Sequence, residues 1–173
     1  DTPVIVAFWS STDNLNQCIS YSNDRGRTWT KYDNNPVLVH PERDPRVFWY
    51  EAGKKWILVL SGAGNTYVLF ESTNLTSWRK LSTVPGFYEC PDMFPLPVDG
   101  DRSRIKWVVI GGDGSYAVGD FDGTTFKPET EVRHASGPHF YATQTWNHIP
   151  EKDGRRIQIA CMRGGKYPNM PFN

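Results

Sequence analysis

The stretch Ser22-Asn23-Asp24-Arg25-Gly26-Arg27-Thr28-Trp29 is the first of three similar segments in the chain. Ser72-Thr73-Asn74-Leu75-Thr76-Ser77-Trp78 echoes it, and Asp120-Phe121-Asp122-Gly123-Thr124-Thr125-Phe126 echoes it more loosely. The aromatic residue that closes each segment recurs about every 50 residues, and a second pair of segments, Lys55-Trp56-Ile57-Leu58 and Lys106-Trp107-Val108-Val109, has the same spacing. A period near 50 with about four strands per unit is typical of a β-propeller.

Between these segments the apolar residues alternate or form short runs, and no stretch has the stripe of a helix. The pattern predicts an all-β chain of roughly 13 strands, grouped about three, four, four and two. We therefore expect a partial propeller of about three to three and a half blades of four antiparallel strands in a single incomplete domain, 1–173. Its expected parts are a partial blade at about 1–38, blades at about 39–85 and 86–135, and a partial blade at about 136–173.

Composition narrows the classes of partner. The 19 Lys and Arg residues balance the 19 Asp and Glu residues, so no net charge attracts nucleic acid or an anionic membrane surface. Aromatic residues make up 14% of the chain, which favours carbohydrate, because sugar faces stack on aromatic rings. The three cysteines and four histidines show neither a disulfide framework nor metal-ligand spacing, so we expect no metal and no cofactor.

The two ends of the chain suggest a segment of a longer protein. Asp1-Thr2-Pro3 leads almost at once into an apolar strand, and no signal peptide and no run of about 18 apolar residues is visible. A ring of fewer than about four blades does not close, so the expected end strands expose unpaired edges. Pairing of these edges between copies is one route to a homo-oligomer.

Two acidic units occupy corresponding positions in the repeat. Glu89 lies in Gly86-Phe87-Tyr88-Glu89-Cys90-Pro91-Asp92-Met93-Phe94, and Asp44 lies in Arg43-Asp44-Pro45-Arg46-Val47-Phe48-Trp49. Either acid alone is compatible with a plain turn cap at a strand edge. Both, however, precede the expected innermost strand of a blade, so we expect them to converge on the axial cavity, as paired carboxylates do in glycoside hydrolysis. We also expect Tyr88 and Cys90 to desolvate Glu89 and to raise its pKa, as general-acid catalysis requires.

Arg43-Asp44-Pro45 and Glu89-Cys90-Pro91-Asp92 resemble the RDP and EC motifs of glycoside hydrolase family 32, the β-fructosidases. The resemblance extends over essentially all 173 residues. It implies a five-bladed propeller and a retaining enzyme that hydrolyses fructosyl linkages in levan, inulin or sucrose. The tail around Arg163-Gly164-Gly165 is most similar to levanases and exo-inulinases.

The resemblance also implies roles for individual residues. Glu89 would be the acid/base, Asp44 with Arg43 would bind fructose hydroxyls and stabilise the transition state, and Cys90 would tune the acid. Four further residues are candidates for the substrate-binding pocket, each with a structural alternative: Asp92 (or a support of local backbone), Tyr141 and Gln144 (or core packing), and Trp49 (or core packing).

The sequence departs from the family at the nucleophile. The family nucleophile is an aspartate in a WMNDPNG-like motif, and Asn34-Asn35-Pro36 does not match it. The aromatic-Ser-Gly-Ser motif of the next blade is also missing, and Cys161 stands where many relatives carry an aromatic residue. A retaining mechanism needs two carboxylates, so we expect this chain alone to hydrolyse fructans weakly or not at all.

Two other classes fit parts of the sequence. Ser22 to Trp29 also matches the Asp-box of sialidase-like propellers, which indicates fold rather than activity. Without a nucleophile, a non-catalytic carbohydrate-binding or self-associating propeller is the alternative to an enzyme. The resemblance, with a weak sequon at Asn74-Leu75-Thr76, implies an extracellular or periplasmic location.

Overall fold

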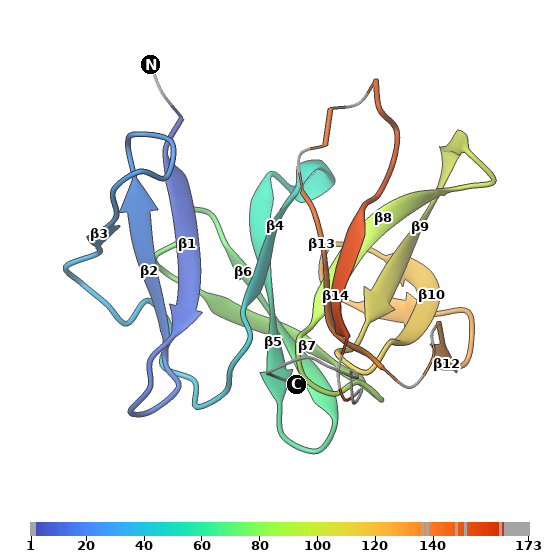
Figure 1. The fold of residues 1–173 in the computed structure, drawn as a ribbon, viewed down its shortest axis with the longest axis horizontal. Helices are drawn as coiled ribbons and strands as arrows, with labels where there is room; N and C mark the ends of the chain where they lie inside the picture. Colours follow the sequence, from blue (N-terminus) through green and yellow to red (C-terminus); the bar gives the residue numbers. More distant parts are fainter. Residues whose placement is uncertain are drawn as a thin grey trace, which may run out of the picture.

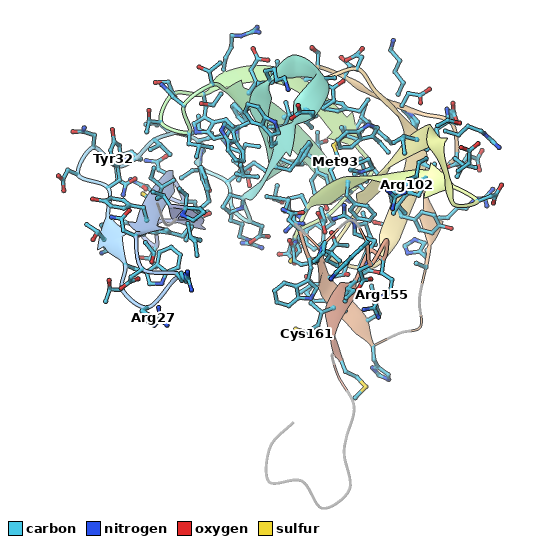
Figure 2. The ribbon with its side chains drawn as sticks, turned by 90° about the horizontal axis from the view of Figure 1, so that it is seen from above. Arg27, Tyr32, Met93, Arg102, Arg155 and Cys161 are labelled. Atoms are coloured by element: carbon cyan, nitrogen blue, oxygen red, sulfur yellow. The ribbon has the colours of Figure 1, made fainter. Side chains whose placement is uncertain are left out.

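The computed structural model describes residues 3–135, 137, 139–147, 149–150, 152–162 and 164. The described chain is all-β, with antiparallel sheets that follow one another in chain order (Figure 1). Seen from above, the sheets are arranged along an arc, as the blades of a propeller are (Figure 2). The prediction of an all-β partial propeller is confirmed. Arg163 and Gly165 of the predicted tail motif, and residues 166–173, lie outside the described residues.

Each sheet is built from strands that are consecutive in the chain. The first holds β1 (Ile5–Ser10), β2 (Gln17–Ser22) and β3 (Thr30–Lys31). The second holds β4 (Arg46–Tyr50), β5 (Lys55–Gly62), β6 (Thr66–Ser72) and β7 (Arg79–Pro85), with the short helix η1 (Glu51–Gly53) between β4 and β5. The third holds β8 (Asp92–Val98), β9 (Asp101–Ile110), β10 (Ser115–Phe121) and β11 (Phe126–Pro128), and the short β12 (Arg133–His134) also pairs with β10. The fourth holds β13 (Phe140–Thr145) and β14 (Gln158–Met162).

Two details of the third sheet differ from the sequence prediction. The polar run 99–104 predicts a long turn, but β9 already begins at Asp101. The turn is short because Asp99 (φ 52°) and Gly100 (φ 80°) both adopt the left-handed conformation that a two-residue hairpin turn requires. The strand β12 was not predicted, since two polar residues carry no periodic pattern.

The repeated segments share one physical device, an oxygen that caps the turn after a strand. In the first, Asp24 Oδ1 accepts a hydrogen bond from the Thr28 backbone N–H at 2.9 Å. This bond and the other hydrogen bonds that Asp24 accepts lower its pKa to about 2. In the second, Asn74 Oδ1 accepts from Thr76 N–H at 3.0 Å. In the third, Asp122 Oδ1 accepts from Thr125 N–H at 2.8 Å. The repeat in the sequence therefore corresponds to a repeated turn in the structure.

The second sheet is buried on both faces, which explains its continuous apolar strands. One face packs against the third sheet in a single cluster of buried residues that includes Phe48, Tyr67, Met93, Val109 and Phe121. The other face forms a second buried cluster from Leu58, Leu60, Val68 and Phe70, against which Leu38, Val47 and Trp78 pack. Ile57, Leu58, Val59 and Leu60 have no exposed surface at all. A sheet that packs on both sides loses the alternation of polar and apolar residues.

Candidate active site

Three segments far apart in the sequence meet at the start of β4, β8 and β13. Arg43 and Asp44 directly precede β4, Glu89 and Cys90 directly precede β8, and Tyr141 lies near the start of β13. Side-chain hydrogen bonds join Arg43 to Glu89, and Tyr141 to Glu89. The structure thus brings together residues that the sequence predicted to converge.

The carboxylate of Glu89 is held on both of its oxygens. Arg43 Nη2 donates to Oε1, and the hydroxyl of Tyr141 donates to Oε2. The Glu89 side chain is 15% exposed and that of Arg43 is 49% exposed. Glu89 therefore keeps access to solvent, while its charged partner lies at the mouth of the site.

Asp44 lies beside this pair and is bonded to the neighbouring segment. Its Oδ2 accepts the backbone N–H of Cys90 at 3.0 Å and lies 3.8 Å from Nε of Arg43. The Asp44 side chain is 31% exposed, so a ligand can reach it. One contact from Asp44 and one from Arg43 thus tie the segment before β4 to the segment before β8.

Four residues of the site have a backbone conformation that side chains rarely adopt. The φ angles are 64° at Asp44, 47° at Glu89, 44° at Cys90 and 52° at Ala142. A left-handed conformation is strained for residues other than glycine, and such strain concentrates at functional sites. Glu89 and Cys90 adopt it in succession, which turns the chain sharply just before β8. Aspartate adopts this conformation more often than most residues, but no sequence pattern predicts it at Glu89, Cys90 and Ala142.

The expected rise in the pKa of Glu89 is wrong for this arrangement. The hydrogen bond from Tyr141 lowers the pKa of Glu89, and the bond from Arg43 lowers it further, because both stabilise the carboxylate. Partial burial acts in the opposite direction but does not outweigh these bonds. Tyr88, expected to desolvate the acid, is itself 49% exposed. The carboxylate form of Glu89 is therefore the favoured form here.

Asp92 is buried inside the fold and has a structural position. The residue has no exposed surface, and its Oδ1 forms an ion pair with Arg46 Nε at 2.8 Å. Its oxygens also accept the backbone N–H of Met93 at 2.9 Å and of Thr145 at 2.6 Å. Asp92 therefore joins β4, β8 and β13 from within, and the expectation that it contacts substrate is not supported by its position.

Gln144 is bonded to the acidic segment, of which Cys90 is a part. Gln144 Nε2 donates to the carbonyl of Pro91 at 3.1 Å, so its amide faces the main chain next to Glu89. Burial, followed by the nearby Asp44 carboxylate, raises the pKa of Cys90 to about 11. Cys90 is therefore a neutral thiol at physiological pH.

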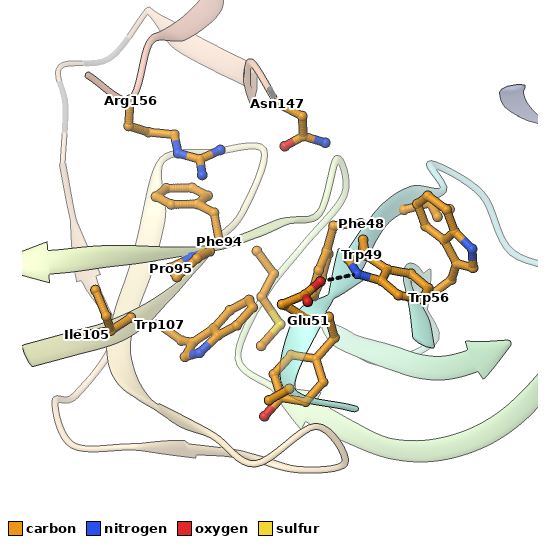
Figure 3. Close-up of a pocket in the computed structure, with 14 residues that line it drawn as sticks. Phe48, Trp49, Glu51, Trp56, Phe94, Pro95, Ile105, Trp107, Asn147 and Arg156 are labelled. Atoms are coloured by element: carbon orange, nitrogen blue, oxygen red, sulfur yellow. Dashed lines mark hydrogen bonds between the residues drawn. The ribbon is translucent and has the colours of Figure 1, made fainter. Parts of the chain in front are cut away.

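Trp49 is not brought to the carboxylates. It lies at the far end of β4, five residues beyond Asp44, which is about 16 Å along an extended strand. There it lines a cavity of about 630 Å³ together with Trp56, Phe94, Trp107 and Arg156 (Figure 3). Trp49 Nε1 donates to Glu51 at 2.6 Å, and its ring meets the ring of Trp56 edge to face at 5.2 Å. The position of Trp49 does not support its expected place in a substrate-binding pocket at the acidic site.

Sequence reasoning missed several residues that support the site. Arg46 follows Asp44 by two positions, but nothing in its residue type predicts that it forms an ion pair with Asp92 on another sheet. Tyr67 lies inside an apolar strand and looks like core, yet its hydroxyl donates to the carbonyl of Glu89 at 2.7 Å. Gly112 looks like an ordinary turn glycine, yet its N–H donates to the carbonyls of both Tyr88 and Glu89 at 3.0 Å.

The described part of the chain shows neither a metal-binding cluster nor a membrane-spanning helix. Within those residues, no group of three or more His, Cys, Asp or Glu side chains is placed to hold a metal ion. The same residues contain no helix with the length and hydrophobicity needed to cross a membrane.

Comparison with known proteins identifies the family. Residues 2–172 match the family described as glycosyl hydrolases family 32 N-terminal domain. The chain belongs to glycoside hydrolase family 32. In an alignment of 178 residues it is 44% identical to a levanase of Bacillus subtilis (strain 168), over 88% of the chain and 26% of the relative. It is 35% identical over 199 residues to the extracellular exo-inulinase of Aspergillus niger (strain ATCC MYA-4892 / CBS 513.88 / FGSC A1513), over 92% of the chain and 36% of the relative.

Solved structures of family 32 proteins agree with this assignment. The crystal structure of exo-inulinase from Aspergillus awamori is similar with a TM-score of 0.82 and 30% identity, over 99% of this chain and 43% of that one. The β-fructofuranosidase of Schwanniomyces occidentalis, in complex with fructosyl-erythritol, is similar with a TM-score of 0.74 and 35% identity, over 84% of this chain and 32% of that one. The chain thus spans 26% to 43% of the length of these relatives.

Proposed function

We propose that this chain carries the acid/base part of a retaining glycoside hydrolase site that acts on fructosyl linkages of levan, inulin or sucrose. The observation that carries the proposal is the Glu89 carboxylate, bonded by Arg43 and Tyr141 and placed beside Asp44. The names of the relatives, which include levanase, exo-inulinase and β-fructofuranosidase, support the substrate class. Membership of family 32 supports hydrolysis as the reaction.

In the proposed reaction Glu89 acts twice. Its protonated carboxyl group gives a proton to the glycosidic oxygen as the bond from that oxygen to the anomeric carbon of fructose breaks. A second carboxylate forms a bond to the same carbon. Glu89, now ionised, then takes a proton from the water that replaces the second carboxylate, which restores both groups. The family motif for that second carboxylate is absent from the 173 residues, so we propose that the chain alone is weakly active or inactive.

Asp44 and Arg43 are proposed to bind the fructosyl ring. Asp44 lies next to the Glu89–Cys90 segment, where its side-chain oxygens accept hydrogen bonds from sugar hydroxyls and stabilise the positive charge that develops in the transition state. A hydroxyl that accepts from Arg43 weakens the Arg43–Glu89 pair. Loss of this charged partner raises the pKa of Glu89 and favours the protonated acid at the moment when catalysis requires it.

The experiment that tests the proposal measures fructose release from levan, inulin and sucrose. It compares the 173-residue chain with the protein expressed from its complete natural reading frame, each with Glu89→Gln and with the control Glu131→Gln, a change at an exposed position. We expect release by the protein from the natural reading frame, a loss of about 10³-fold or more in Glu89→Gln, and no change in Glu131→Gln. Release that is unaffected by Glu89→Gln would refute the acid/base assignment.

A carbohydrate-binding role without turnover is the second candidate, favoured by the missing nucleophile motif. It predicts binding of levan or inulin oligosaccharides by calorimetry with no fructose release from either protein. An extracellular location is proposed from the relatives named extracellular exo-inulinase, and detection of the protein in the culture medium tests it. Self-association through sheet edges is tested by size-exclusion chromatography, in which a clean monomer would exclude it.

A further inference from the structure

Gly112 connects the two segments that hold the Glu89 carboxylate. Its backbone N–H donates to the carbonyls of Tyr88 and Glu89, each at 3.0 Å, so it binds the main chain of the acidic segment. Its carbonyl accepts the N–H of Ala142 at 2.7 Å, one residue after Tyr141. One residue in the turn between β9 and β10 therefore sets the distance between the acid and the tyrosine that bonds it.

Tyr67 supports the same carbonyl from the protein interior. Its side chain is fully buried on β6, and its ring stacks on Phe87 with a centroid distance of 5.4 Å. Its hydroxyl donates to the carbonyl of Glu89 at 2.7 Å. Burial raises the pKa of Tyr67 far above its ordinary value, so the hydroxyl stays a donor throughout the physiological range.

The two donors offset an unfavourable backbone. Glu89 and Cys90 have φ angles of 47° and 44°, and such angles persist only when the surrounding structure enforces them. The Glu89 carbonyl accepts from Gly112 N–H and from Tyr67 Oη, which fixes the peptide plane between Glu89 and Cys90. The orientation of that plane determines where the Glu89 side chain points.

A side chain at position 112 would crowd the Glu89–Cys90 turn. A Cβ atom there would lie 3.2 Å from Cβ of Cys90, 3.3 Å from the carbonyl oxygen of Glu89 and 3.4 Å from Sγ of Cys90. The φ angle of Gly112 is not in the left-handed region, so alanine is compatible with its backbone. Any effect of Gly112→Ala therefore comes from pressure on the Glu89–Cys90 turn.

We propose that Tyr67 and Gly112 are positioning residues. They hold the Glu89 carboxyl group in contact with Tyr141, in the position from which Glu89 transfers its proton to the glycosidic oxygen. The inference rests on the acid/base role proposed for Glu89. Neither residue reaches the carboxylate itself: both act through the carbonyl of Glu89, and Gly112 also acts through Ala142. A misplacement of about 1 Å at a catalytic group can lower the rate about a hundredfold.

The test uses the protein expressed from its complete natural reading frame, with two variants and two matched controls. Tyr67→Phe removes one hydroxyl and keeps the ring, and Gly112→Ala adds one methyl group. The controls are Tyr116→Phe, at a tyrosine whose hydroxyl makes no hydrogen bond with the described residues, and Gly137→Ala, at a glycine where no atom of the described residues lies within 4 Å of an added Cβ. We expect kcat on sucrose and levan to fall about tenfold to a hundredfold in both variants, with KM within about threefold of the parent and both controls unchanged.

A second measurement reads the turn without using activity. Alkylation of Cys90, followed by peptide mass spectrometry in a Cys161→Ser background, reports how firmly the Glu89–Cys90 turn is held. We expect faster Cys90 modification in Tyr67→Phe and Gly112→Ala and parental rates in the controls. If Gly112→Ala does not fold, Tyr67→Phe, which keeps its core packing, decides the outcome alone.

The outcomes separate this proposal from the one on which it rests. Parental kcat and parental alkylation in Tyr67→Phe would overturn the positioning role. Full activity of Glu89→Gln would overturn the acid/base role, whatever Tyr67→Phe does. A fall in kcat with Glu89→Gln inactive and Cys90 more reactive supports both.

Discussion

Replacing Asp92 with asparagine tests whether this buried carboxylate joins three sheets of the fold. The side chain has no exposed surface and accepts hydrogen bonds from Met93 N–H at 2.9 Å and Thr145 N–H at 2.6 Å. It also pairs with Arg46 Nε at 2.8 Å. Asparagine keeps the volume of the side chain but removes its charge and replaces one acceptor oxygen with an NH₂ donor.

The expected cost follows from these contacts. Breaking a buried ion pair by removing one partner costs about 3–5 kcal/mol, because the remaining charge stays buried without compensation. The Arg46 side chain is 15% exposed and still donates to the Thr145 carbonyl at 2.7 Å and to Asn147 Oδ1 at 3.0 Å. These contacts partly compensate the charge, so we expect the lower end of the range, about 3 kcal/mol. This is a large fraction of the 5–15 kcal/mol that stabilises a typical domain.

The assay is urea denaturation followed by tryptophan fluorescence, with Asp99→Asn as the matched control. Asp99 is exposed in the turn before β9, where its left-handed φ of 52° suits asparagine equally well. We expect the control to stay within about 0.5 kcal/mol of the parent. An Asp92→Asn variant that is equally close to the parent would refute the reasoning. A double-mutant cycle with Arg46→Met adds a check, because two residues in direct contact should give a non-additive double variant.

Three further predictions concern other parts of the chain. Tyr141→Phe removes a hydrogen bond that lowers the pKa of Glu89, so the alkaline limb of the kcat/KM profile moves to higher pH; an unchanged profile would contradict this. Asp24→Ala lowers the thermal stability at neutral pH. The difference in stability from the parent shrinks as the pH falls towards the Asp24 pKa of about 2, because the ionised carboxylate that stabilises the folded state becomes protonated there. Trp49→Ala keeps the parental rate of fructose release, and a tenfold loss would place this residue in the substrate site.

The fold was predictable because one turn is repeated. Asp24, Asn74 and Asp122 each cap a turn with a side-chain oxygen, and this local chemistry leaves its trace in local sequence. The sheet boundaries follow from the short apolar runs between the turns. Strand ends were less predictable: the start of β9 at Asp101 depends on the left-handed pair Asp99-Gly100, and β12 exists only through pairing with β10.

The sequence predicted those site residues whose role follows from their residue type, and missed those whose role depends on a contact in space. Glu89 and Asp44 stand out as acids that precede corresponding strands, and the structure places them together. Tyr67 is a buried core residue, as its place in an apolar strand predicts. Its proposed positioning role depends on a hydrogen bond from its hydroxyl to the carbonyl of Glu89, 22 residues later in the chain, which the sequence does not reveal. The pKa of Glu89 was wrongly predicted from its neighbours in sequence, because its nearest partners in space are Arg43 and Tyr141.

Two arginine–carboxylate pairs connect the start of β4 to the start of β8, and their different exposure gives them different roles. Arg46 pairs with Asp92, and Arg43 pairs with Glu89, three residues earlier on each segment. The inner pair has side chains 15% and 0% exposed, so separating it leaves a charge without water and the strands stay fixed. In the outer pair Arg43 is 49% exposed, so water or a sugar hydroxyl can replace its bond to Glu89 at little cost. The same type of pair therefore fixes the strands inside the fold and, at the surface, forms a reversible contact; in the mechanism proposed above, a bound sugar changes the protonation of Glu89 through this outer contact.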